Sequence, residues 1–297
     1  MDPEAAAADV LGRCARGELS PEVALVRLLI AYGDVDALGS GLAAAGRAAR
    51  DAGMRGAIER VRNLLAGNSE GSALVLAMLA RERAAAGAEA ADEVERCRDL
   101  FDRLVGESAE ASVALYSLGD PGLLDAATRE VVALLDRLAV LGTERQILEI
   151  GCGIGRFQRA LAGRVAAITG IDIATRMIAV ARQRCVGLPN VTLLETAGRD
   201  LSQFASGSFD AVLAIDAMPY LYRAGTALVA THFAEAARVL RAGGDFVILN
   251  LSYRGDLDLD RQDARRLAAT TGFTVLRDGT TDLELWDGAT FHLRKDG

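Results

Sequence analysis

A run of alternating glycines stands in the middle of the chain. Gly151, Gly153 and Gly155 follow a short β-rich stretch, and Glu149 comes just before them. Glycine lets the backbone turn sharply and approach a ligand more closely than a Cβ would permit. A helix beginning at about Arg156 would add the free N–H groups of its first turn. This pattern is typical of a nucleotide-binding loop.

A second acid follows at a spacing that suits a ribose. Asp172 ends the next β-rich run, 17 residues after Gly155, and a carboxylate there can accept hydrogen bonds from both ribose hydroxyls. The dinucleotide fingerprint G-x-G-x-x-G would require glycine at position 156, which is Arg156. The spacing therefore disfavours a nicotinamide dinucleotide.

Short β-rich runs alternate with helical periods from residue 146 onward. This alternation predicts a parallel sheet with helices on both faces. The glycine loop and Asp172 would then lie at the carboxyl ends of neighbouring strands, where such sheets bind ligands. We expect strands at 147–150, 167–172, 191–194, 211–215, 246–249, 273–276 and 290–294, and helices at 174–184, 228–240 and 261–269.

The first part of the chain is expected to be all-helical. Ser20 followed by Pro21 predicts a helix N-terminus, and Gly33 predicts its end. Apolar residues recur there at intervals of three and four, without strand-like alternation. We therefore predict a helical domain at 1–118, which covers the substrate or forms a homodimer, and an α/β domain at 119–297.

Composition excludes several functional classes. The formal net charge is -8, Lys295 is the only lysine, and no basic run exists, so we expect no nucleic-acid partner. The 4 cysteines form no CxxC pair and the chain has 2 histidines, so we expect no metal site. The apolar stretches are far shorter than the roughly 20 residues of a membrane span, and the acidic start does not read as a leader. A cytoplasmic location without membrane attachment is expected.

From about residue 146 to residue 294 the chain resembles the class I S-adenosylmethionine-dependent methyltransferases. The stretch from Ile147 to Gly155 is similar to that family's first motif, and the one ending at Asp172 to its ribose-binding acid. Gly207–Asp210 and Arg238–Gly244 match two later motifs in the correct order. The resemblance implies a Rossmann-like seven-stranded sheet with an antiparallel last strand. It also implies S-adenosylmethionine as cofactor, S-adenosylhomocysteine as product and methyl transfer to a small-molecule acceptor.

The resemblance also implies the cofactor residues. The glycines would lie against the methionine part, with Glu149 supporting the loop. Ala197 stands where the family usually has an acid for the adenine amino group, so backbone groups of Gly198 and Arg199, or the Asp200 side chain, are expected there. The cofactor-binding set is Glu149, Gly151, Cys152, Gly153, Gly155, Asp172, Ile173, Gly198, Arg199, Asp200 and Ile215.

The acceptor is expected beyond the fourth and fifth strands. Holding the methyl donor and the acceptor in position can lower the activation barrier by roughly 7–11 kcal/mol. A general base lowers it by roughly 3–5 kcal/mol. A capping role is the alternative for His232, and His292 is expected to face solvent. Candidate catalytic groups are Asp216, His232 and Tyr220, and candidate acceptor contacts are Tyr116, Met218, Tyr220, Asn250 and Tyr253.

Two other functions remain open. The same cofactor could donate its aminocarboxypropyl arm or be cyclised, or the chain could bind it without catalysis. Release of S-adenosylhomocysteine distinguishes methyl transfer from the other two reactions.

Overall fold

The computed structural model describes residues 3–86 and 92–297, and its contacts divide the chain into two compact units. The helical unit contains the described residues among 1–89, Leu104–Glu130 and Leu283–Asp287. The sheet unit contains the described residues among 90–103, Val131–Asp282 and Gly288–Gly297. The units are thus interleaved along the chain, and a single boundary between residues 118 and 119 stays a prediction.

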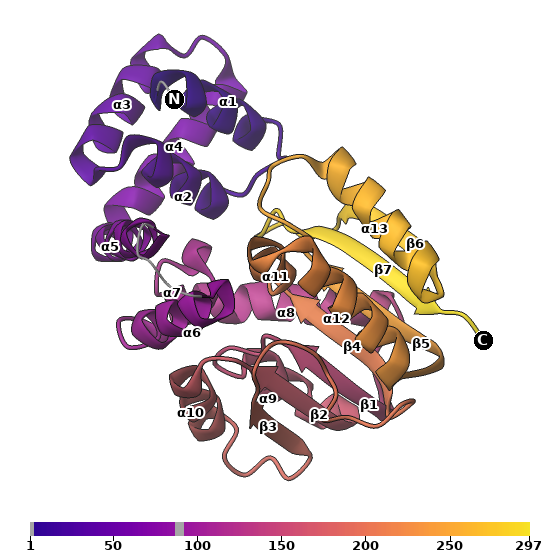
Figure 1. The fold of residues 1–297 in the computed structure, drawn as a ribbon. Helices are drawn as coiled ribbons and strands as arrows, with labels where there is room; N and C mark the ends of the chain where they lie inside the picture. Colours follow the sequence, from indigo (N-terminus) through magenta and orange to yellow (C-terminus); the bar gives the residue numbers. More distant parts are fainter. Residues whose placement is uncertain (1–2, 87–91) are drawn as a thin grey trace. The chain divides into compact units, whose positions relative to one another are not determined.

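The helical unit follows the capping signals of its sequence. Ser20 Oγ accepts a 3.1 Å hydrogen bond from the amide of Val23, and Gly33 ends the same helix with φ +69°. Both predicted boundaries of that helix are confirmed. The helices of this unit are α1 (Pro3–Ala15), α2 (Pro21–Tyr32), α3 (Val35–Ala48), α4 (Ala52–Gly67), α5 (Ser69–Ala86), α7 (Ala109–Val113), the 3-10 turn η1 (Leu115–Ser117) and the first part of α8 (Pro121–Arg137) (Figure 1).

The segment Leu283–Asp287 belongs to the helical unit although it lies between the last two strands in sequence. Glu130 accepts hydrogen bonds from the amides of Glu284 and Leu285, the latter at 3.0 Å. Trp286 is buried and its ring stacks on Tyr116 with centroids 6.0 Å apart. The sequence pattern had not suggested this attachment.

The sheet unit contains one seven-stranded sheet in the order β3-β2-β1-β4-β5-β7-β6. Strand β7 is antiparallel to both of its neighbours, whereas β1 to β5 are parallel. The predicted sheet and its antiparallel last strand are therefore confirmed. The strands are β1 (Gly142–Ile150), β2 (Val165–Asp172), β3 (Val191–Glu195), β4 (Phe209–Ile215), β5 (Leu240–Leu249), β6 (Phe273–Thr281) and β7 (Ala289–Lys295).

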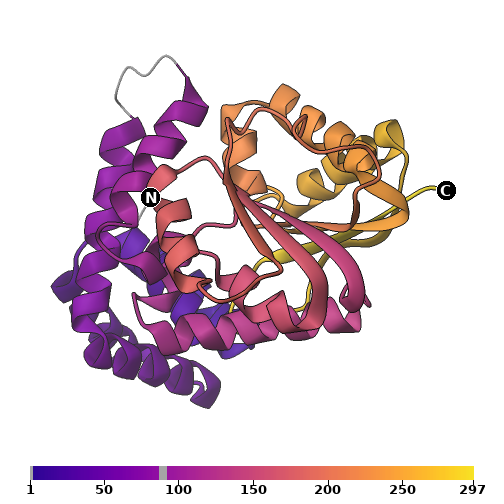
Figure 2. The same ribbon diagram turned by 90° about the horizontal axis from the view of Figure 1, so that it is seen from below.

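Helices pack on this sheet through apolar side chains. Phe233 on α12 (Thr226–Val239) and Leu267 on α13 (Leu257–Thr271) lie in the same buried cluster as Phe246 of β5. The ribbon views show both helices against the same face of the sheet (Figures 1 and 2). Cys152 and Ile178 belong to a second, smaller cluster beside β3. The helices are α6 (Glu93–Leu104), α9 (Arg156–Leu161), η2 (Ala162–Arg164), α10 (Thr175–Arg184), α11 (Met218–Ala224), α12 (Thr226–Val239) and α13 (Leu257–Thr271).

The fifth strand begins at Leu240, six residues earlier than expected. Pairing of β4 with β5 moves from Phe209↔Leu240 to Ala211↔Asp245, so the residues between Leu240 and Asp245 bulge out of register. Gly243 has φ +71°, which glycine adopts without a steric penalty. Gly243 and Gly244 therefore lie in a β-bulge near the start of β5.

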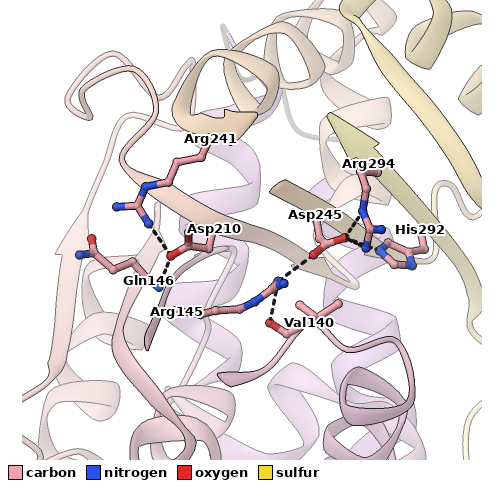
Figure 3. A network of polar contacts seen from close by, with 8 residues as sticks. All are labelled: Val140, Arg145, Gln146, Asp210, Arg241, Asp245, His292 and Arg294. Carbon is pink, nitrogen blue, oxygen red and sulfur yellow. Dashed lines mark hydrogen bonds and ion pairs between the residues drawn. The ribbon is translucent and has the colours of Figure 1, made fainter. Parts of the chain in front are cut away.

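A buried ionic network joins β1, β5 and β7 (Figure 3). Asp245 is fully buried and accepts bonds from Arg145 at 2.7 Å and Arg294 at 2.8 Å. The Nε2 atom of His292 lies 2.9 Å from Oδ1 of Asp245. The expectation that His292 faces solvent is wrong, because its side chain is only 3% exposed and pairs with the buried Asp245 of the neighbouring strand β5.

Candidate cofactor and acceptor site

The glycine loop leaves the end of β1 and turns back toward β2. The amides of Gly151 and Cys152 both donate to the carbonyl oxygen of Ile171, at 2.8 and 3.0 Å. Gly151, Gly153 and Gly155 have φ values of +72°, +53° and +75°. Side chains are disfavoured in this region of backbone space, so the loop requires glycine for its conformation.

Two of these glycines also make close contacts within the protein. A Cβ on Gly151 would lie 2.6 Å from Cβ of Ala217, which follows β4. A Cβ on Gly155 would lie 3.0 Å from Cβ of Ala181 on α10. The glycines therefore let the loop pack against the end of β4 and against α10, in addition to any ligand.

Asp172 connects this loop to the end of β2. Its Oδ2 accepts a 2.8 Å hydrogen bond from the amide of Gly153, and its Oδ1 accepts one of 2.9 Å from Ala174. Burial raises the pKa of Asp172, while the amide donors oppose that rise. Each carboxylate oxygen has two acceptor positions, so ribose hydroxyls could still be bound.

Glu149 is almost fully buried beneath the loop. It is 1% exposed, and Gln158 donates a 2.6 Å hydrogen bond to its Oε2. Burial raises the pKa of Glu149 to about 8. Gly170, its neighbour on β2, makes room for this pair, because a Cβ there would lie 2.7 Å from Nε2 of Gln158. A glycine inside a strand pattern signals such a close approach, but Gln158 had no signal in the sequence.

The chain after β3 lines a cavity of about 350 Å³. Gly198 has φ +68° there, and a Cβ on it would lie 2.5 Å from Cγ2 of Ile173. Arg199 forms an ion pair with Asp92, and Asp200 Oδ1 accepts bonds from the amide and hydroxyl of Ser202. The cavity is lined by Leu194, Glu195, Thr196, Ala197, Gly198, Arg199, Asp200, Ser202 and Gln203.

Helix α6 packs along this same edge of the sheet unit. Arg98 Nε donates to the carbonyl of Ile173 at 3.0 Å. Asp102 Oδ1 accepts a 2.7 Å bond from the amide of Arg176 in the first turn of α10, a helix whose own N-cap residue supplies no side-chain bond. The amphipathic pattern predicted α6 itself, but nothing in the sequence predicted its contact with the residues after Asp172.

The ends of β4 and β5 bring four of the predicted acceptor-side residues together. Asn250 Nδ2 donates to Asp216 Oδ1 at 3.0 Å. Burial, together with the neighbouring Asp216 and Tyr220, raises the pKa of Tyr253 well above its ordinary value. The Tyr220 ring also packs edge-to-face against Phe101 of α6, with centroids 4.8 Å apart. Because Ala217 touches Gly151, this cluster adjoins the glycine loop.

A comparison with protein families identifies the sheet unit. A family model described as a methyltransferase domain matches residues 148–248, which run from β1 to β5 and include the glycine loop and Asp172. Residues 148–248 thus carry a methyltransferase domain.

Named relatives are also similar to part of this chain. The demethylmenaquinone methyltransferase of Tropheryma whipplei (strain Twist) is 34% identical over 156 residues, 52% of this chain and 59% of the relative. The methyltransferase GfsG of Streptomyces halstedii is 32% identical over 142 residues, 47% of this chain and 49% of that protein. The matched part thus spans between 49% and 59% of these relatives.

A solved structure agrees with the fold of the methyltransferase domain. The magnesium protoporphyrin IX methyltransferase of Synechocystis PCC 6803, crystallised with bound SAM, superposes with a TM-score of 0.53 at 18% identity. The superposition covers 70% of this chain and 100% of that one. At this identity the likeness establishes the fold.

Three other predicted site residues have the following surroundings. His232 is buried on α12, and its Nδ1 lies 2.9 Å from the carbonyl oxygen of Leu228. Burial lowers the pKa of His232. Met218 is fully buried in the apolar cluster. Tyr116 belongs to the helical unit. Roles for these residues in catalysis or acceptor binding stay predictions.

Ile215 and Cys152 are also buried, at 5% and 3% exposure. Ile215 is the last residue of β4, and Cys152 lies within the glycine loop. Within 3–86 and 92–297, no group of three or more potential metal-binding side chains was found. No helix in those ranges is long and apolar enough to cross a membrane.

Proposed function

We propose that this chain transfers a methyl group from S-adenosylmethionine to a small-molecule acceptor. The observation that carries the proposal is the 2.8 Å hydrogen bond from the amide of Gly153 to Asp172. This bond connects the glycine loop after β1 to Asp172, the acid expected to bind the ribose, at the carboxyl ends of two adjacent parallel strands. Such strand ends are where α/β sheets bind nucleotides.

The residues present fit this cofactor. The half-buried carboxylate of Asp172 keeps acceptor positions for two ribose hydroxyls, and the loop at Gly151 and Gly153 offers backbone without a Cβ. The cavity after β3 provides Gly198 and Asp200 for the adenine. When bound, S-adenosylmethionine would supply a methyl group on a sulfonium whose leaving group is a neutral thioether.

Positioning is the larger part of the expected rate enhancement. Near-attack geometry can contribute roughly 7–11 kcal/mol, whereas a general base contributes roughly 3–5 kcal/mol. Asp216 and Tyr220 stand beside the glycine loop and are the groups that could orient an acceptor. The relative from Tropheryma whipplei is named for a small-molecule acceptor, demethylmenaquinone, which supports this substrate class.

The decisive experiment uses S-adenosylmethionine labelled in its methyl group and a metabolite extract. We expect a labelled small molecule and an equal amount of S-adenosylhomocysteine. Release of methylthioadenosine in place of S-adenosylhomocysteine would indicate aminocarboxypropyl transfer or cyclisation. Cofactor binding without any product would indicate a non-catalytic protein. Assembly of the helical unit into a homodimer is a separate prediction, which sedimentation of the whole chain tests.

A further inference from the structure

Asp216 and Asn250 form a matched pair at the ends of neighbouring strands. Both have left-handed backbone, with φ +61° and +63°. Such values are uncommon for residues other than glycine and persist where the surrounding structure holds them. Asn250 is held on two sides, because its amide donates to the carbonyl of Ala289 at 2.9 Å and its Oδ1 accepts from the amide of Ala289 at 3.2 Å. Its Nδ2 is thereby aimed at Asp216.

Tyr253 continues this polar chain. Its ring contacts that of Tyr220, and burial of its hydroxyl, with Asp216 and Tyr220 nearby, raises its pKa well above the ordinary value. The residue as a whole is nevertheless 55% exposed. Its hydroxyl is thus held inward as a neutral phenol, while part of its surface stays open to solvent.

The same side chains form an aromatic wall. The Tyr220 ring packs edge-to-face with Tyr253, with centroids 5.8 Å apart, and also edge-to-face with Phe101. Aromatic pairs prefer this edge-to-face geometry. The flat ring of a bound acceptor can pack against these side chains in the same way. Because Ala217 contacts Gly151, the wall stands beside the loop proposed for the cofactor.

We propose that Tyr220, Tyr253 and Asp216 form a proton relay for an acceptor hydroxyl carried on a flat conjugated ring, a phenol or an enol. Tyr220 is the catalytic residue that contacts the acceptor, and Asn250 is a positioning residue that acts through Asp216. This proposal rests on the proposed methyl transfer and adds the acceptor class and the path of its proton.

The proton balance needs no further reactant. The acceptor hydroxyl gives its proton to Tyr220, Tyr220 gives its own to Tyr253, and Tyr253 gives its own to Asp216, which becomes neutral. The acceptor oxygen bonds to the methyl carbon while the electron pair of the broken carbon–sulfur bond stays on sulfur. A phenol has a pKa near 10, close to that of tyrosine, so the first transfer, from the acceptor to Tyr220, is nearly matched. An amine can be methylated first and lose its proton to water afterwards, so it needs no relay.

The acceptor class is tested with phenols and naphthols, each paired with the amine of the same ring, and with methyl-labelled S-adenosylmethionine. We expect transfer to hydroxyl members at least about ten times faster than to the matched amines, a difference within the range of general-base catalysis. Equal rates, preference for the amines, or no transfer to any hydroxyl member overturns the acceptor class. Labelled product in the metabolite extract would still support the proposed function in those cases.

The relay is tested by Tyr253→Phe, with Tyr222→Phe as a matched control. Tyr222 lies on α11 beside Tyr220, but its hydroxyl is paired with Asp263 at 3.4 Å. We expect kcat to fall about 100-fold in Y253F and to stay unchanged in Y222F. Calorimetry should show unaltered affinity for S-adenosylhomocysteine in both. An equal kcat in Y253F and the wild type overturns the relay.

Asn250→Asp separates positioning from folding. This change keeps an oxygen for the amide of Ala289 and places a second carboxylate against Asp216. A second negative charge this close raises the pKa of Asp216. The acid limb of the profile of kcat/KM against pH should therefore move to higher pH. An unmoved acid limb in a folded variant that binds S-adenosylhomocysteine overturns the role of Asn250.

Discussion

The amide of Gly153 donates a 2.8 Å hydrogen bond to Oδ2 of Asp172. A single acid therefore sets the shape of the glycine loop and remains half-buried at the edge of the sheet. The amide of Ala174 binds the other oxygen, so the carboxylate also fixes the turn that leads into α10. Loss of this acid should disturb two segments of the proposed cofactor site together.

Asp172→Asn is expected to lower affinity for S-adenosylhomocysteine by about 10–100-fold. The amide group would turn one NH₂ toward a backbone N–H, and a hydrogen bond to a charged group contributes about 1.5–3 kcal/mol. Calorimetry measures this change. Asp258→Asn is the control, since the Asp258 side chain is 82% exposed. Wild-type affinity in D172N would contradict the assignment.

Gly151→Ala should destabilise the protein more than Gly187→Ala. Both glycines have positive φ, +72° and +84°, so both substitutions carry a backbone strain of about 1–2 kcal/mol. A Cβ on Gly151 would also lie 2.6 Å from Ala217, whereas no atom lies within 4 Å of one on Gly187. Thermal unfolding gives the stabilities and calorimetry the cofactor-product affinity. Equal losses in both variants would show that the contact with Ala217 is unimportant.

The parts of the site that could be predicted from sequence are those whose chemistry is local. The spacing from Gly151 to Asp172 fixed a strand, a turn and a second strand end, and the structure has this arrangement. Asp216 and Asn250 were placed at strand ends by the same pattern, but their hydrogen bond depends on the order of β4 and β5 in the sheet.

Contacts between distant segments could not be predicted. His292 alternates with apolar neighbours as a solvent-facing residue would, yet it pairs with Asp245, 47 residues away. Phe101 lies on a predicted helix, but periodicity shows only that the helix has an apolar face and not which partner that face meets. The helix α11, which carries Tyr220, had no strong capping signal and was not expected.

Glu149→Gln should remove a pH dependence of stability. The pKa of Glu149 is raised from 4.5 to about 8 in the folded protein, chiefly by burial. The folded state therefore binds the proton more tightly than the unfolded state. The stability that protonated Glu149 contributes is fully present below about pH 4.5 and is lost as the pH rises through 8.

We therefore expect E149Q to gain stability relative to the wild type between pH 5 and pH 9, by up to a few kcal/mol. Urea unfolding of the cofactor-free protein at several pH values measures this difference. A difference in unfolding free energy that stays constant across that range would show that Glu149 keeps its ordinary pKa in the folded protein.

Asp245→Asn should destabilise the protein at neutral pH, and this loss of stability should be smaller at acidic pH. Burial alone would raise the pKa of Asp245, but its bonds to His292, Arg145 and Arg294 lower it to about 2. Its contribution is thus fully present above about pH 3.8 and is lost as the pH falls through 2. Removing one partner of a buried ionic network costs about 3–5 kcal/mol.

The measurement for Asp245 is the difference in unfolding free energy between D245N and the wild type from pH 7 to pH 2. We expect the difference to be largest at pH 7 and to shrink below pH 4, because the protonated wild-type side chain then resembles the amide. Asp258→Asn, at an exposed position, should show little difference at any pH. A gap for D245N that stays constant down to pH 2 would mean that the network stabilises the sheet by packing and not by the charge of Asp245.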